Sequence, residues 1–164
     1  MKTKNVGSLA KGFTLIELVV VISIVGILAA VALPRFIAMQ NQARGAKAQA
    51  LFGAIRSAAA LAHAGCITNV GGNCTPTGGS VLMEGAIINM TNGYPAANIA
   101  TTTPGGIILA VQINPTADAV TVGLVGNSVT VDINGGTAPN CRVTYTEAVA
   151  VNTSPGVVVD VSGC

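Results

Sequence analysis

The feature that most constrains this chain is an apolar run of 21 residues, Phe13 to Leu33, in which Glu17 is the sole ionisable side chain. As an α-helix this run rises about 31 Å, which matches the hydrocarbon core of a bilayer. A lone carboxylate at that depth costs at least about 2.5 kcal/mol on insertion scales, and such residues usually mark a functional site. The run therefore predicts a membrane-spanning helix whose carboxylate pairs with another group.

The segment before the run, residues 1–12, is short, basic and polar. A secretory signal has its cleavage site after the apolar region, and the sequence Ala-Val-Ala at 30–32 offers such a site. A conventional signal peptide released after Ala32 is therefore an alternative interpretation. The length of the run, the presence of Glu17 and the helical pattern beyond Ala32 favour a leader that ends before the run.

The sequence FTLIELVVVISIVGILAAVALPRF, which follows Gly12, resembles the N-terminal signature of type IV pilins and pseudopilins. The resemblance implies that a membrane peptidase cleaves between Gly12 and Phe13 and that the new amino group of Phe13 is methylated. It also implies that Glu17, the fifth residue of the processed chain, docks subunits into a helical filament. The implied fold is α+β: a long N-terminal helix packed on a small antiparallel β-sheet head.

The physical argument for Glu17 is independent of the resemblance. Cleavage would create an amine on Phe13, with an ordinary pKa of about 7.7 to 8.0, about one helical turn from Glu17. The two groups could pair within one subunit or between neighbours, and pairing between neighbours would set their register more than it would add stability. The alternative is that Glu17 merely favours the positive end of the helix dipole.

Gly26 and Pro34 are the predicted weak points of this helix. Glycine lowers helix propensity by about 1 kcal/mol. Proline at 34 removes the hydrogen bond to the carbonyl of Ala30. Local melting between them on assembly is what the resemblance implies, and an ordinary kink is the alternative.

From residue 35 to 64 the helix is predicted to continue as an amphipathic element on which the head folds. Polar residues recur every seven positions at Arg35, Gln42, Gln49, Arg56 and His63, and the opposite side carries Leu51, Ile55, Ala58 and Ala62. His63 is expected to be solvated or hydrogen-bonded rather than a ligand.

Residues 65–164 are predicted to form a disulfide-bonded, β-rich head. Its four cysteines are Cys66, Cys74, Cys141 and Cys164. An even number in an exported chain indicates two disulfides, and of the three possible pairings loop-closure entropy favours Cys66 with Cys74 and Cys141 with Cys164. A zinc site is the disfavoured alternative, because the chain has one histidine and no CxxC.

Within the head, residues 65–80 read as a loop, and the stretch from Met83 to Ala97 weakly resembles pilins of the mannose-sensitive haemagglutinin type. Strands are predicted at 107–113, 119–125, 128–133, 142–151 and 157–161, forming an antiparallel sheet with turns at 126–127 and 134–136. The region between the last two cysteines resembles the D-region of pilins.

Catalytic and cofactor-binding patterns are missing from the sequence, so we expect no enzyme activity and no cofactor. Residues 132–136 (DINGG) have a faint calcium-loop pattern without the later acidic ligand, and a turn is the better interpretation. Without residues 1–12, five basic and six acidic side chains remain, so nucleic-acid binding has no electrostatic support.

The sequence thus predicts a pilus subunit that waits in the inner membrane as a single-pass protein and then enters an extracellular filament. Its expected partners are copies of itself or other pilins, the prepilin peptidase and methyltransferase, and the membrane assembly machinery. The expected uses are adhesion, surface colonisation or motility. The alternatives are a pseudopilin of a type II secretion system and a membrane-anchored binding domain that does not polymerise.

Overall fold

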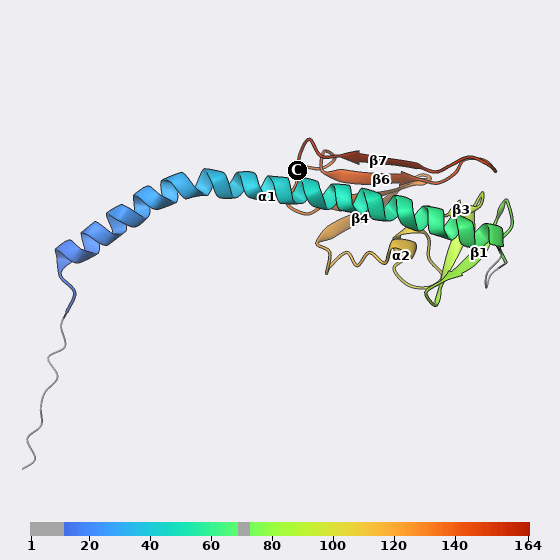
Figure 1. Cartoon of the computed structure of the whole chain (residues 1–164), viewed down its shortest axis with the longest axis horizontal. Coiled ribbons are helices and arrows are strands. Elements are labelled where there is room, and N and C mark those ends of the chain that lie inside the picture. Colours follow the sequence, from blue (N-terminus) through green and yellow to red (C-terminus); the bar gives the residue numbers. More distant parts are fainter. Residues whose placement is uncertain (1–11, 69–72) are drawn as a thin grey trace, which may run out of the picture. The chain divides into compact units, whose positions relative to one another are not determined.

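The structure is a computed structural model that describes residues 12–68 and 73–164. The predicted leader therefore lies outside the described residues, except for Gly12. The chain divides into two compact units, Met1–Met39 and Gln40–Cys164. One helix, α1 (Leu15–Thr68), contributes to both units (Figure 1). We describe each unit by itself and call the second one the head.

In the first unit, α1 exposes its apolar side chains. Phe13, Leu15 and Ile27 are between 68% and 83% exposed. In the described part of the chain, α1 is the one helix long and apolar enough to cross a membrane, and its most apolar window has no buried residue. Such a surface needs lipid or other protein around it, since water solvates it poorly.

Gly26 and Pro34 both lie inside α1, which is helical without interruption from Leu15 to Thr68. The structure contains no melted segment between them. Their role as weak points during assembly remains a prediction. The helix also extends four residues beyond the predicted end at residue 64.

In the head, α1 buries one face, which is built mainly from small residues: Ala48, Ile55, Ala58, Ala59 and Ala62. This confirms the apolar face predicted from the sequence, with Leu51 half-buried at its border. Alanines let the sheets approach the helix backbone closely, and Ile55 fills the space among Ile107, Ile108 and the valines of the sheet. The helix is therefore one layer of the head core.

The strands form two antiparallel sheets rather than the single sheet predicted. The first contains β1 (Gly78–Met83), β2 (Ala86–Thr91) and β3 (Tyr94–Pro95) in that order. The second contains β4 (Val120–Val125), β5 (Ser128–Ile133), β6 (Arg142–Thr146) and β7 (Gly156–Asp160), also in chain order. The bounds predicted for β5 are confirmed, and those for β4 and β7 differ by one residue.

Three predictions about local structure were wrong. Residues 107–111 form a short helix, α2 (Ile107–Val111), and not a strand. A short buried apolar run does not distinguish the two by its pattern, and here Gln112 ends the helix in the left-handed region at φ 61°. Residues 78–80, expected in a loop, begin β1. β6 ends at Thr146, five residues early, and the next residue, Glu147, accepts a hydrogen bond on its carboxylate from the Ala97 N–H at 2.8 Å.

Polar contacts join the second sheet to its surroundings. The buried Tyr145 hydroxyl donates to the Pro95 carbonyl at 2.6 Å, which links β6 to β3. The Arg44 guanidinium donates to the Cys164 carbonyl at 3.1 Å, and Lys47 Nζ donates to the Asp118 carbonyl. The head half of α1 is therefore held to the second sheet and its loops by charge-assisted hydrogen bonds as well as by apolar packing.

Candidate functional site

The candidate site is the beginning of α1, where Thr14 precedes the first helical residue. The Glu17 N–H donates to Thr14 Oγ1 at 3.3 Å, and the Thr14 hydroxyl donates to Glu17 Oε2 at 3.4 Å. A Thr followed three residues later by Glu at a helix start is the capping-box pattern, and here its first half is formed: the Thr14 hydroxyl satisfies the Glu17 N–H, which has no partner within the helix. The sequence carried this signal as Thr-Leu-Ile-Glu at 14–17, and the sequence analysis missed it.

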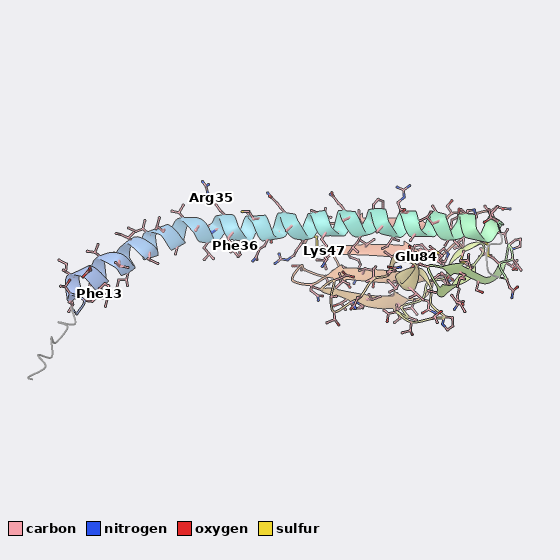
Figure 2. The ribbon with its side chains drawn as sticks, turned by 60° about the horizontal axis from the view of Figure 1, so that its bottom comes forward. Phe13, Arg35, Phe36, Lys47 and Glu84 are labelled. Carbon is pink, nitrogen blue, oxygen red and sulfur yellow. A yellow bond between two sulfur atoms is a disulfide. The ribbon has the colours of Figure 1, made fainter. Side chains whose placement is uncertain are left out.

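The capping contact gives Glu17 a local partner that is weak and exposed. Both hydrogen bonds are long and lie at the surface. They leave room at the carboxylate for a stronger, charged donor, because an ionised carboxylate accepts several hydrogen bonds. Figure 2 shows Phe13 beside the start of α1, and in the sequence Phe13 stands four residues before Glu17. That separation is a rise of about 6 Å along a helix.

Cleavage at Gly12, methylation of Phe13 and docking through Glu17 concern chemistry and partners that a single chain does not contain. Gly12 and Phe13 are exposed and non-helical, so the peptide bond between them lies in extended or irregular backbone before α1. Proteases bind their substrates in extended form, and a non-helical bond meets this requirement. The three assignments stay predictions.

The cysteines form the two disulfides that loop closure favoured, Cys66 with Cys74 and Cys141 with Cys164, which confirms that prediction. Their Cα atoms are 5.2 Å and 4.7 Å apart. The first joins the last turns of α1 to the residues that precede β1. The second joins the buried Cys141, which directly precedes β6, to Cys164, whose carbonyl also accepts the hydrogen bond from Arg44.

His63 is a structural residue, as the sequence predicted. Its ring stacks on Tyr94 with centroids 4.1 Å apart and planes 3° from parallel. Since the Gly93 carbonyl 2.7 Å away can only accept, His63 Nδ1 carries the proton and donates it. The stack attaches the last turns of α1 to the β2 to β3 turn.

The residues of the faint calcium pattern are engaged elsewhere. Arg142 donates two hydrogen bonds to Asp132, at 2.6 Å and 2.9 Å, in a bidentate pair across β5 and β6. The hydrogen bond raises the pKa of Arg142 above its already high ordinary value. Residues 134–135 form a turn, as predicted. Among the described residues no group of three or more His, Cys, Asp or Glu side chains is placed to hold a metal ion.

Comparison with known proteins identifies the N-terminal segment. Residues 8–33 match the family model described as "Prokaryotic N-terminal methylation motif". Over 53 residues the chain is 57% identical to a protein of Thermus thermophilus named "Type IV narrow pilus major component PilA5". The match covers 32% of this chain and 46% of that relative, so the chain spans less than half the length of the curated relative it matches. No solved structure matches the chain.

The segment that matches is the segment that contains Gly12, Phe13 and Glu17. The described fold, a long N-terminal helix packed on antiparallel sheets, is of the pilin kind that the sequence predicted. By this N-terminal segment, the chain is similar to type IV pilins that carry an N-terminal methylation motif.

Proposed function

We propose that the protein is a structural subunit of a type IV pilus, not an enzyme, and that it polymerises through the N-terminal half of α1. The observation that carries the proposal is the exposure of this segment: the apolar side chains from Phe13 to Leu33 are all exposed, and Glu17 near their start is the one acid among them. Before assembly, lipid covers this surface. After assembly, the same surface of neighbouring subunits covers it.

Glu17 would set the register of the neighbours. Prepilin peptidase removes residues 1–12, and the new Phe13 amine becomes the cation that Glu17 of an adjacent subunit requires. In a low dielectric an unpaired partner is strongly penalised, so subunits that enter out of register would be rejected. Cleavage would then control assembly, because the uncut chain has no amine at Phe13.

The protein would lie in the inner membrane, spanning it once, until the assembly machinery extracts it into an extracellular filament. The two disulfides suit a head exposed outside the cell, where thiols oxidise. They favour a surface pilus over the periplasmic pseudopilus of a type II secretion system. The pilus would serve attachment, surface colonisation or motility.

Intact mass spectrometry of filaments sheared from the cell surface tests the proposal. We expect a chain that begins at Phe13, carries one added methyl group, and has all four cysteines oxidised. A chain that begins at Met1 or at Leu33, or filaments that lack this protein, would contradict it. A Gly12 variant that blocks cleavage is the matched control and should leave uncut protein in the membrane and no filaments.

A further inference from the structure

Two surfaces of the head lie on opposite flanks of the buried face of α1. On one flank a groove of about 540 Å³ runs between α1, the β1 to β2 turn and α2. Its helix side is formed by Ala54, Ser57, Ala58 and Leu61. On the other flank a depression of about 240 Å³ lies between α1, β3 and β7, and its helix side is formed by Arg56, Ala59, Ala60 and His63. We call these the Glu84 flank and the Arg56 flank after the charge that each carries.

Glu84 lies at the edge of its groove, in a backbone conformation that is uncommon for glutamate. It occupies the first position of a two-residue hairpin turn with Gly85, and both residues have positive φ, 47° and 82°. Such turns favour Asn, Asp or Gly at the first position, so a Glu there is conformationally costly. Gln112 donates a hydrogen bond to the carboxylate. Figure 2 shows Glu84 in the head beside α1.

Neither charge is neutralised within the described part of the chain. Glu84 forms no ion pair there, and the single ion pair found joins Arg142 to Asp132. The Arg56 guanidinium lies over the Phe52 ring, 5.5 Å from its centroid, and is otherwise exposed. The Glu84 flank also exposes Leu61, at 63% of its surface. Each flank therefore combines an unneutralised charge with apolar surface, and the two charges are opposite.

A helical filament requires two different, complementary surfaces on each subunit. Subunits related by a screw axis touch through two different surfaces, one on each side of the subunit, and not through one self-complementary patch. We propose that the Arg56 flank of one subunit docks against the Glu84 flank of the next, with an ion pair between Arg56 and Glu84 and with Leu61 covered by the neighbour. The inference rests on the proposed function, since it takes a second copy of this chain as the partner.

Cross-linking tests the contact directly. Filaments of the full chain carrying Arg56→Cys and Glu84→Cys are oxidised mildly and run on a denaturing gel without reductant. We expect a ladder of covalent oligomers, because the two positions lie on opposite flanks of one subunit and meet only between subunits. The control pairs Arg56→Cys with Asp160→Cys, since Asp160 is an exposed residue of β7, the strand that borders the Arg56 flank. That pair should give no ladder.

Charge reversal supplies the second measurement. Arg56→Glu or Glu84→Arg alone should lower the number of surface filaments about tenfold, because like charges then face each other at every contact. The double reversal should restore filaments to within about twofold of the natural chain, and Asp160→Arg alone should leave them unchanged. Membrane-extracted subunits of each variant must melt within a few degrees of the natural protein, which shows that they fold.

Failure of the contact and failure of the proposed function give different results. If filaments contain the protein but no ladder forms and the double reversal does not restore the count, the pairing of the flanks is wrong while the pilin function stands. If the natural chain forms no filaments, the proposed function itself is wrong.

Discussion

The Thr14 hydroxyl lies 3.4 Å from Glu17 Oε2, and the Glu17 N–H lies 3.3 Å from Thr14 Oγ1. The acid of the apolar run is thus held at the first turn of α1 before any second subunit is present. This contact separates two roles of the segment: Thr14 caps the helix, and Glu17 is available for a charged partner.

Thr14→Ala should remove the cap and leave assembly largely intact. Losing an N-cap hydroxyl costs about 1 kcal/mol of helix stability, whereas the register in the filament would depend on Glu17 and the Phe13 amine. We expect surface filaments within about twofold of the natural number by electron microscopy. Thr14→Ser keeps the hydroxyl and is the matched control. A loss as complete as that of Glu17→Ala would show that the cap, not the ion pair, governs assembly.

Tyr145→Phe should destabilise the head by about 1 to 2 kcal/mol at neutral pH, because the Pro95 carbonyl loses its 2.6 Å donor in a buried place. Chemical denaturation of the detergent-solubilised chain measures this change. Tyr94→Phe keeps the stacked ring beside His63 and is the matched control. An equal or smaller loss for Tyr145→Phe than for Tyr94→Phe would contradict the role of the buried hydroxyl.

Tyr145 should also make the stability of the head depend on pH. Burial, and to a lesser extent the nearby Glu147 charge, raises the pKa of Tyr145 far above its ordinary value. The unfolded chain loses this proton near pH 10 and the folded chain keeps it, so the folded state is favoured fully below about pH 10 and progressively less above it. Stability should fall above that pH by up to about 1.4 kcal/mol per unit, and Tyr145→Phe should lack this component. If stability falls equally with rising pH in the natural protein and in Tyr145→Phe, the pH dependence does not come from Tyr145.

The two disulfides should contribute unequally to the stability of the head. The bridges close loops of 8 and 23 residues, and the chain-entropy relation gives about 2.5 and about 3.4 kcal/mol for them. Replacing Cys141 and Cys164 together by Ser should therefore lower the melting temperature more than replacing Cys66 and Cys74, all the more because Cys141 is buried in the core. Differential scanning calorimetry of the two double variants measures the order. The reverse order would contradict the argument.

Asp132 should behave as an ion-pair partner and not as a calcium ligand. Its pair with Arg142 is only partly exposed, with 28% and 19% of the side chains accessible, so Asp132→Asn should cost about 0.5 to 1 kcal/mol. Millimolar calcium should leave the melting temperature of the natural protein unchanged. A rise on adding calcium that Asp132→Asn abolishes would restore the metal interpretation.

Much of the fold could be read from the sequence, since strong periodicity dictates the elements. The 3.6-residue pattern placed Ile55, Ala58 and Ala62 on the buried face of α1, and alternating valines defined β5. The helix at 107–111 was missed because Ile107 and Ile108 are buried among both α1 and the sheet, and a short run buried on all sides has no period.

Of the residues given a functional role, some could be predicted from the sequence and others could not. Glu17 was singled out because a charge in an apolar run is conspicuous whatever the fold, whereas Gly12 and Phe13 came from the resemblance to type IV pilins. Arg56 and Glu84 were not predicted as a pair, because their significance depends on which flank of α1 each occupies. That arrangement results from tertiary packing of the β1 to β2 hairpin, and no local pattern in the sequence encodes it.

The central claim is that Glu17 sets subunit register through the neighbour's Phe13 amine, and pilus counts on cells carrying Glu17→Ala test it most directly. Glu17→Gln is the matched isosteric control, and intact mass establishes that cleavage after Gly12 still occurs in both. The account predicts processed subunits in the membrane and few or no surface filaments for both variants, because neither side chain carries the charge. Normal filaments in normal number on the Glu17→Ala cells would contradict it.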